Sequence, residues 1–206
     1  MQHTKKVVTA GKPLAEAKQA LIMIHGRGAD ALDILSVAEY LNVKDYALLA
    51  PEATNYTWYP YSFMAPQEQN EPWLSSALDI VKSVMDDVIQ AGISTENIYF
   101  LGFSQGACLT LEFTTRHAQR FGGVVAFSGG LIGQQLQLEN YQHDFQQTPV
   151  FLGCSDIDPH IPLARVQESG KLLESKNANL TLKIYPKMGH TINEDEIQTV
   201  NNYIFR

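Results

Sequence analysis

The sequence predicts an α/β fold in which helices cover both faces of a mostly parallel sheet of about six to seven strands, without a large cap domain. Two observations predict it. Short apolar runs alternate with longer amphipathic segments along most of the 206 residues, as in strands joined by helical crossovers. Several runs, such as 20–24, are continuously apolar, which is typical of strands buried on both faces. No shift in composition divides the chain, so we expect one domain over residues 1–206.

The expected strands are short apolar runs, in chain order 6–9, 20–24, 46–50, 98–101, 123–127, 149–153 and 180–185. The first is short and is followed by a turn at 11–13, so we place it at the edge of the sheet. The second leads into a tight, glycine-containing loop at 25–28, and the third is closed by Pro51. This order predicts that the loops after the parallel strands gather at one edge of the sheet, where sites in such folds lie.

The expected helices lie between these strands, at 30–41, 72–91, 107–117, 163–175 and 193–205. Pro72 suits the first turn of the second helix, and Gly92 is a typical stop signal after it. The apolar stripe of that helix, from Leu74 to Ile89, is expected to pack in the core. Asn193 is a good N-cap for the last helix, with Glu196 three residues later.

The sequence Gly102-Phe103-Ser104-Gln105-Gly106 lies between an expected strand and an expected helix. Strand, sharp turn and helix form the context of a nucleophile elbow, in which a strained turn exposes a serine and the flanking glycines let the backbone come close. The pattern therefore predicts an α/β-hydrolase fold with Ser104 as its nucleophile.

A serine nucleophile needs a general base and an acidic residue that orients the base. With this type of elbow the chain order is serine, acid, histidine, which favours His190 as the base. Asp156 and Asp158 both follow the strand at 149–153, and residue chemistry alone does not separate them. His160, near both, is a minor candidate for a metal ligand, but no spaced partner motif accompanies it, and we expect no metal or cofactor.

Negative charge on the substrate carbonyl oxygen requires fixed hydrogen-bond donors. The backbone N–H of Gln105, directly after the nucleophile, is one expected donor. The loop at 25–28 follows an early central strand, and the backbone N–H of Arg27 is expected to be the second donor. The side chain of Arg27 is a candidate to meet an anionic group of the substrate.

The rest of the composition narrows the class of protein. The net charge of −7 gives no reason to expect nucleic acid as a partner, and no apolar run is long enough for a membrane span. No signal peptide is recognisable, so we expect a cytoplasmic protein. Cys108 and Cys154 are expected to be small buried residues. Residues 51–70 form a long irregular segment rich in aromatics, which predicts either a pocket wall or a patch for a homodimer.

Four motifs give the chain a resemblance to the phospholipase/carboxylesterase family, which includes the acyl-protein thioesterases: Gly-Phe-Ser-Gln-Gly at 102–106, His-Gly-Arg-Gly at 25–28, Asp-Pro-His-Ile-Pro at 158–162 and Met-Gly-His at 188–190. The resemblance implies that Asp158, not Asp156, is the catalytic acid. It also places Trp58 in a loop beside the active site, and we expect substrate contacts from Trp58, Phe63 and Ile161. Residues 56–66 differ from the corresponding loop of the thioesterase branch.

The expected function is a serine carboxylesterase that cleaves a carboxylic ester, or alternatively a thioester, of a small or acyl-chain molecule through an acyl-enzyme. One alternative is a dienelactone-hydrolase-like enzyme acting on cyclic esters, although that group uses a cysteine nucleophile. Another is an acyl-protein thioesterase or lysophospholipase. A non-enzymatic alternative is a catalytically silent binding module, which should lack a triad residue or an oxyanion donor.

Overall fold

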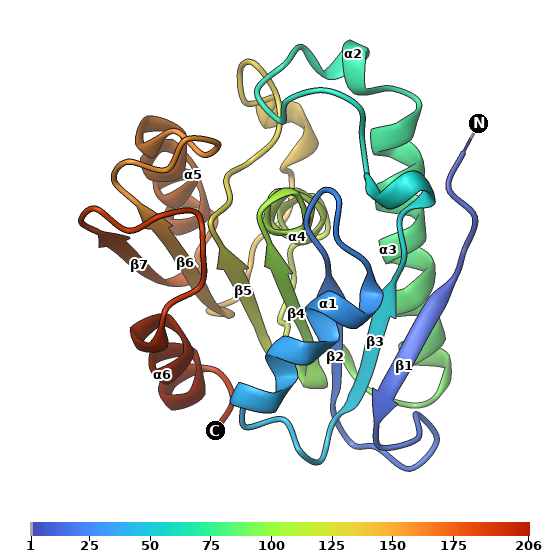
Figure 1. Ribbon diagram of the computed structural model, residues 1–206. Helices are drawn as coiled ribbons and strands as arrows, with labels where there is room; N and C mark the ends of the chain where they lie inside the picture. Colours follow the sequence, from blue (N-terminus) through green and yellow to red (C-terminus); the bar gives the residue numbers. More distant parts are fainter. Residues whose placement is uncertain (1) are drawn as a thin grey trace.

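The computed structural model describes residues 2–206, in which one seven-stranded sheet runs through the molecule (Figure 1). The strands are β1 (Val7–Gly11), β2 (Ala20–Ile24), β3 (Ala47–Pro51), β4 (Ile98–Phe103), β5 (Gly123–Phe127), β6 (Pro149–Ser155) and β7 (Asn179–Tyr185). Their order across the sheet is β1-β3-β2-β4-β5-β6-β7. The edge strand β1 pairs antiparallel with β3, and every other pairing is parallel. The mostly parallel sheet and the edge position of the first strand are as predicted.

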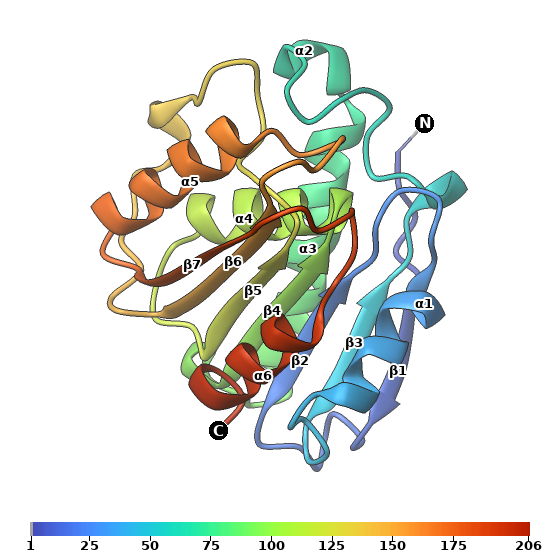
Figure 2. The ribbon, with the colours of Figure 1, turned by 60° about the vertical axis from the view of Figure 1, so that its left-hand side comes forward.

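Helices cover both faces of this sheet (Figures 1 and 2). They are α1 (Ala31–Ser36), α2 (Gln67–Asn70), α3 (Trp73–Gln90), α4 (Gln105–Arg116), α5 (Leu163–Ser175) and α6 (Glu194–Tyr203), with short 3₁₀ turns η1 (Val37–Tyr40), η2 (Thr54–Tyr56), η3 (Thr95–Asn97) and η4 (Leu138–Asn140). Buried residues of α1 and α6 belong to the core on one face, and those of α3, α4 and α5 to the core on the other. Each face of the sheet is therefore shielded from water.

Two expected helices differ in detail from the sequence prediction. The helix expected over 30–41 is split, because a capping box between Asp30 and Asp33 starts α1 and the chain tightens into η1 from Val37. In α3 the expected apolar stripe is buried from Leu74 to Val88, whereas Ile89 is 40% exposed, one residue from the end of the helix.

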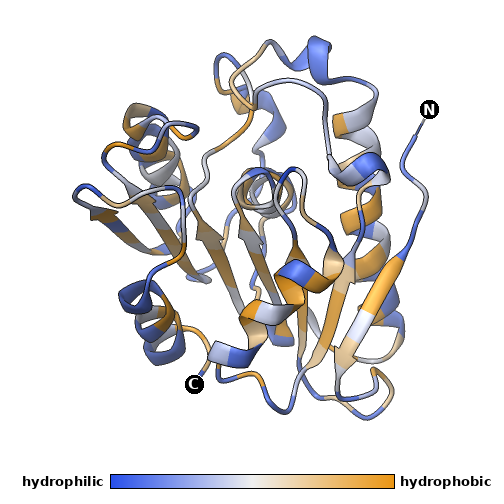
Figure 3. Cartoon of the chain, in the orientation of Figure 1, coloured by the Kyte–Doolittle hydropathy of each residue, from blue (hydrophilic) through white to orange (hydrophobic). Residues whose placement is uncertain are grey.

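The strands β2 and β5 are buried along their whole length, and the hydropathy colouring shows that the middle of the sheet is mostly apolar (Figure 3). Ala20–Ile24 has no exposed surface at any position. Phe100 of β4 packs against Phe113 of α4, with ring centroids 5.6 Å apart, and against Phe121 at 5.1 Å. Burying each such side chain contributes about 1.5–3 kcal/mol, so the middle of the sheet is a firm base for the loops at its edge.

The carboxyl ends of the parallel strands meet at one edge of the sheet. There lie the loop after β2 (25–28), the long segment after β3 (52–66), the turn after β4, and the loops after β6 (156–162) and β7 (186–193). Sites in parallel α/β sheets form at this edge. No helix within residues 2–206 has the length and apolar character needed to cross a membrane.

Candidate active site

Ser104 stands in a strained turn between β4 and α4. Its φ of 56° and ψ of −121° lie in a region that residues with a side chain seldom adopt. The glycines on either side are required by space: a Cβ on Gly106 would lie 2.1 Å from the carbonyl oxygen of Ile24, and one on Gly102 would lie 2.3 Å from that of Gly106. The turn therefore has the geometry of a nucleophile elbow.

The structure brings Ser104, His190 and Asp158 together from three different loops. His190 Nε2 lies 2.7 Å from Ser104 Oγ, and His190 Nδ1 lies 2.7 Å from Asp158 Oδ2. The Asp158 side chain is fully buried, and that of His190 is 18% exposed. With Nδ1–H donating to the carboxylate, Nε2 is free to accept the proton of the serine hydroxyl.

Asp158 is held as a carboxylate by its hydrogen bonds. Burial by itself would raise its pKa, but the hydrogen bond from His190 and those from the amides of His160 and Ile161, at 2.8 and 3.0 Å, lower the pKa below its usual value. Asp156 lies elsewhere and accepts from the amide of Lys187 at 2.7 Å. Of the two aspartates left open by residue chemistry, Asp158 is the one that reaches His190.

The loop 25–28 and the start of α4 lie on the other side of Ser104. A Cβ on Gly26 would lie 3.3 Å from Ser104 Cβ, so this loop passes close to the serine. The backbone N–H groups of Arg27 and Gln105 donate to no acceptor within residues 2–206, and both residues line the cavity beside Ser104. This is where the sequence places the two oxyanion donors, and both N–H groups are available there.

The side chain of Arg27 has a different role from the expected one. Its Nη1 donates to the carbonyl of Pro60 at 3.0 Å, and its Nη2 donates to those of Tyr59 and Tyr61, each at 2.8 Å. The guanidinium is thus engaged by the aromatic segment, so the expected contact with an anionic substrate group is not supported. The side chain of Gln105 binds the same segment, accepting from the Trp58 amide at 3.0 Å and donating to the Tyr59 carbonyl at 2.9 Å.

Trp58 does not line the cavity, so its expected substrate contact is corrected. It has no exposed surface, its indole N–H donates to the carbonyl of His25 at 2.9 Å, and its ring packs 5.0 Å from the imidazole. His25 is itself buried, which lowers its pKa, and its Nε2 accepts from the amide of Ala53 at 3.1 Å. Trp58 therefore packs against the loop 25–28 inside the protein and helps to hold it in place.

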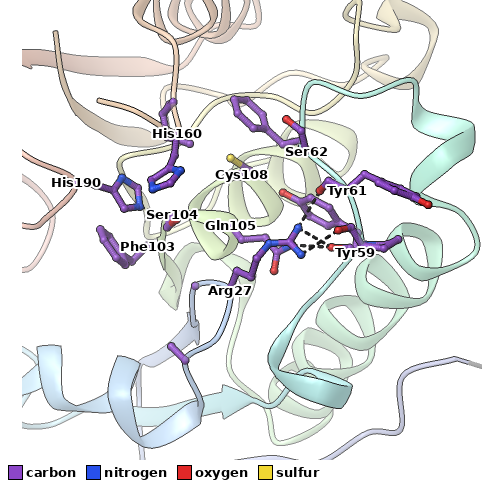
Figure 4. A pocket seen from close by; sticks show the side chains of 15 residues that line it. Arg27, Tyr59, Tyr61, Ser62, Phe103, Ser104, Gln105, Cys108, His160 and His190 are labelled. Atoms are coloured by element: carbon purple, nitrogen blue, oxygen red, sulfur yellow. Dashed lines mark hydrogen bonds between the residues drawn. The ribbon is translucent and has the colours of Figure 1, made fainter. Parts of the chain in front are cut away.

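A cavity of about 490 Å³ opens over Ser104 (Figure 4). It is lined by Gly26, Arg27, Ala29, Tyr59, Pro60, Tyr61, Ser62, Phe63, Phe103, Ser104, Gln105, Cys108, His160, Ile161 and His190. Phe63 and Ile161, two of the three expected substrate contacts, are among them. Most lining side chains are apolar or aromatic, which is typical of pockets for small organic molecules.

Tyr59 and Cys108 are among the lining residues that sequence reasoning did not single out. Cys108 is four residues after Ser104 on α4, so helical spacing places it one turn further on the same face. Its burial was expected, but its position at the cavity was not. Tyr59 carried no comparable signal, because its place depends on hydrogen bonds from two distant segments.

His160 lies beside His190 without forming a metal-binding cluster. Its ring meets that of His190 edge-on, with centroids 4.9 Å apart. Over residues 2–206, no group of three or more histidine, cysteine, aspartate or glutamate side chains is arranged to hold a metal ion. His160 is therefore an aromatic neighbour of His190 at the cavity.

The sheet order, the elbow after β4 and the side chains gathered at the carboxyl edge define an α/β-hydrolase. More particularly, the chain belongs to the phospholipase/carboxylesterase family, hydrolases that act on ester bonds, because the family model matches residues 3–205.

Similar proteins agree with this family. Acyl-protein thioesterase 1 of Kluyveromyces lactis is 28% identical over 208 residues, covering 91% of each chain. A crystal structure of a phospholipase/carboxylesterase from Dyadobacter fermentans is 53% identical with a TM-score of 0.99, covering 100% of this chain and 99% of that one. The Bacillus cereus carboxylesterase, 21% identical with a TM-score of 0.76, covers 96% of this chain and 92% of its own and shares the fold.

Proposed function

We propose that this protein is a serine carboxylesterase in which Ser104, His190 and Asp158 are the catalytic triad. The observation that carries the proposal is the continuous chain of hydrogen bonds from Asp158 through His190 to Ser104, with 2.7 Å at each step. It lies at the cavity, in a strained elbow, beside two unpaired backbone N–H groups. These are the parts that acyl transfer to a serine requires.

The proposed reaction has two halves. Ser104 Oγ attacks the ester carbonyl carbon while His190 Nε2 takes the hydroxyl proton, and Asp158 stabilises the resulting imidazolium. The amides of Arg27 and Gln105 hold the negative oxygen of the tetrahedral intermediate. His190 then donates its proton to the leaving alcohol, and an acyl-enzyme remains. In the second half, water attacks the acyl-enzyme with His190 again as base, which releases the carboxylic acid and restores Ser104.

The substrate is proposed to be a small ester, bound in the cavity with Phe63 and Ile161 against its apolar parts. The name of the Kluyveromyces lactis relative favours a thioester substrate as a second candidate. A cytoplasmic location and a homodimer stay predictions from the sequence.

Hydrolysis of p-nitrophenyl esters from acetate to palmitate tests the proposal. Ser104→Ala should lower kcat by at least ~10⁴-fold, because removing a triad nucleophile leaves only the contributions of binding and the oxyanion donors. Ser36→Ala, which removes an exposed hydroxyl on α1, is the matched control and should keep full activity. Thermal unfolding of both variants reports whether the fold is intact.

The chain-length profile separates the alternatives. A short-chain optimum supports the small-ester assignment, and an optimum at long chains supports the thioesterase or lysophospholipase branch. Substantial activity in folded Ser104→Ala would contradict the triad. Failure of the wild-type protein on every ester, with lactones included, would favour a binding module.

A further inference from the structure

His3 fastens the residues before β1 to α3, and the proposed reaction does not use it. Figures 1 and 2 both show this part of the chain running beside α3. The backbone N–H of His3 donates to Ser76 Oγ of α3 at 2.9 Å, and its ring meets that of Trp73 edge-on, with centroids 5.1 Å apart. His3 is only 8% exposed, so its imidazole lies in the protein interior.

The ring nitrogens of His3 bind the segment that follows β3. Nδ1 lies 3.1 Å from the amide nitrogen of Thr54, and Nε2 lies 2.8 Å from the carbonyl oxygen of Trp58. A backbone N–H can only donate and a carbonyl can only accept, so Nδ1 is unprotonated and Nε2 carries the hydrogen. Both bonds therefore exist together only while the imidazole is neutral, because an imidazolium would turn an N–H toward the N–H of Thr54.

Trp58 connects His3 with the residues that carry the proposed oxyanion donors. Its backbone N–H donates to Gln105 Oε1 at 3.0 Å, and its indole N–H donates to the carbonyl of His25 at 2.9 Å. Gln105 and the loop 25–28 supply the two amides that are proposed to hold the negative oxygen. Since a displacement of catalytic groups by about 1 Å can lower a rate by ~10²-fold, the place of Trp58 matters for turnover.

The elements around His3 offer no charge that would stabilise a protonated ring. Their charged side chains form two ion pairs nearby: Lys5 with Asp87 of α3, and Lys6 with Glu52. The other titratable group that packs on Trp58 is His25, which is itself buried and accepts a backbone N–H. Within residues 2–206, two effects act on the pKa of His3: burial lowers it, and the weaker effect of the hydrogen bond to Trp58 raises it.

The lowered pKa has a direct consequence for the contact. In the bound state the neutral imidazole is favoured, whereas a released imidazole has its ordinary pKa of 6.5. The contact of His3 with Thr54 and Trp58 is therefore fully formed above about pH 6.5 and is weakened as the pH falls below that value.

We propose that His3 is a positioning residue for ester hydrolysis, which as a neutral imidazole holds residues 54–58 so that the two oxyanion donors stay in place. Protonation of Nδ1 breaks the bond from Thr54 and loosens the segment from α3. The inference rests on the proposed esterase function. It adds a pH dependence to that of the base: protonation of His190 alone makes kcat/KM fall in proportion to the proton concentration, and protonation of His3 as well makes the fall steeper.

Tryptophan fluorescence tests the protonation step without any substrate. Trp58 and Trp73 are the two tryptophans of the chain, and the His3 ring contacts both, with centroids 5.5 and 5.1 Å apart. A protonated imidazole in contact with an indole quenches its fluorescence. Between about pH 8 and about pH 5 the wild-type protein should show a reversible change with a midpoint below 6.5. His3→Gln, which keeps a neutral acceptor and donor but does not titrate, should lose most of this change.

Steady-state kinetics on a short-chain p-nitrophenyl ester tests the positioning step. His3→Phe keeps a ring but removes both hydrogen bonds, and at about pH 8 it should lower kcat/KM by about tenfold, mainly through kcat, because the oxyanion donors act in the transition state. His3→Gln should stay within about threefold of wild type at that pH. Toward acid its kcat/KM should fall only in proportion to the proton concentration, whereas that of the wild type falls more steeply.

The matched control is His117→Gln. His117 is a half-buried histidine whose pKa is also lowered by burial, but it packs on Phe113 at the opposite end of α4 from Gln105. Its variant should keep both the fluorescence change and the pH profile of the wild type.

Each outcome decides. A fluorescence change that His3→Gln retains in full, an acid limb of equal steepness in wild type and His3→Gln, or wild-type kinetics in His3→Phe overturns the inference. If His3→Phe does not fold, the comparison of wild type with His3→Gln still decides. Ester hydrolysis that survives in Ser104→Ala is failure of the proposed function instead, because the fluorescence change does not depend on Ser104.

Discussion

The two walls of the cavity are held by different kinds of contact. One, the oxyanion wall, consists of residues 25–28, 56–63 and Gln105, and the other, the base wall, of residues 156–162 and 186–193. In the oxyanion wall Arg27 and Gln105 each bind the aromatic segment, and the Gly28 amide donates to the Tyr56 carbonyl at 2.7 Å. The proposed oxyanion donors thus belong to residues whose side chains also bind the aromatic segment.

The base wall is fixed by acidic and hydroxyl groups at its ends. Asp156 accepts from the Lys187 amide, Ser155 Oγ donates to the Met188 carbonyl, and a capping box joins Asn193 to Glu196. Carboxyl groups titrate within the range in which proteins are handled, whereas a guanidinium does not. Of the two walls, the base wall is therefore the one whose anchors include carboxyl groups.

Within the base wall the two aspartates offer the largest expected contrast. Asp158→Asn should lower kcat by about 10⁴-fold, because an amide neither fixes the tautomer of His190 nor stabilises its imidazolium. Asp156→Asn keeps an acceptor for the Lys187 amide and should change kcat by less than about tenfold. Steady-state kinetics on a short-chain p-nitrophenyl ester measures both. Equal losses in the two variants would mean that the loop, and not the triad, is being disturbed.

A smaller effect on catalysis is expected when the Arg27 side chain, which binds the aromatic segment of the oxyanion wall, is replaced. Arg27→Met keeps the backbone N–H and the length of the side chain but removes the hydrogen bonds to three carbonyls. We expect kcat/KM to fall by about 10- to 100-fold, since a small displacement of catalytic groups costs up to ~10²-fold.

The matched control is Arg120→Met. Arg120 also donates to backbone carbonyls, those of Gln146 and Gln147, but it does not line the cavity. Its variant should keep kcat/KM within about twofold. An Arg27→Met protein with wild-type kinetics would show that the aromatic segment stays in place without its guanidinium.

The same contrast explains what the sequence predicted well. The elbow and the base wall carry local motifs whose chemistry requires particular residues in a fixed chain order. The pattern therefore predicted Ser104 and His190, the resemblance then chose Asp158, and the structure places His190 within hydrogen-bonding distance of the other two side chains. The strands were predictable because they are continuously apolar, as Ala20–Ile24 shows. The N-cap at Asn193 was predictable because its sequence signal is local: Asn193 is followed by Glu196 three residues later.

The oxyanion wall was harder to predict because its contacts join segments far apart in the chain. Nothing near Arg27 indicates that its guanidinium meets carbonyls more than thirty residues away. Trp58 was expected in the cavity because the family resemblance placed it in the loop beside the active site, but its indole N–H donates to the His25 carbonyl inside the protein. Tertiary hydrogen bonds, and not local propensity, decide which aromatic side chain of this segment faces the substrate.

The smallest expected effect concerns Glu196, which anchors one end of the base wall through its capping box with Asn193 and makes the stability of the fold depend on pH. It has no exposed surface, Oε2 accepts from the Asn193 amide at 2.9 Å, and Oε1 has no hydrogen-bond partner within residues 2–206. Burial raises its pKa from 4.5 to about 7, against the hydrogen bond from Asn193. The folded protein therefore holds a proton that the unfolded chain releases, and this contribution to stability is lost as pH rises from about 4.5 to about 7.

Glu196→Gln should remove this pH-dependent loss of stability, because a side-chain amide keeps an acceptor for the Asn193 N–H but does not ionise. Urea unfolding should show the variant close to wild type at about pH 5 and more stable by about 1–2 kcal/mol at about pH 8. Glu194→Gln, on the exposed first turn of α6, is the control and should shift stability by less than about 0.5 kcal/mol at either pH. A stability difference that does not grow with pH would show that the carboxyl of Glu196 ionises freely.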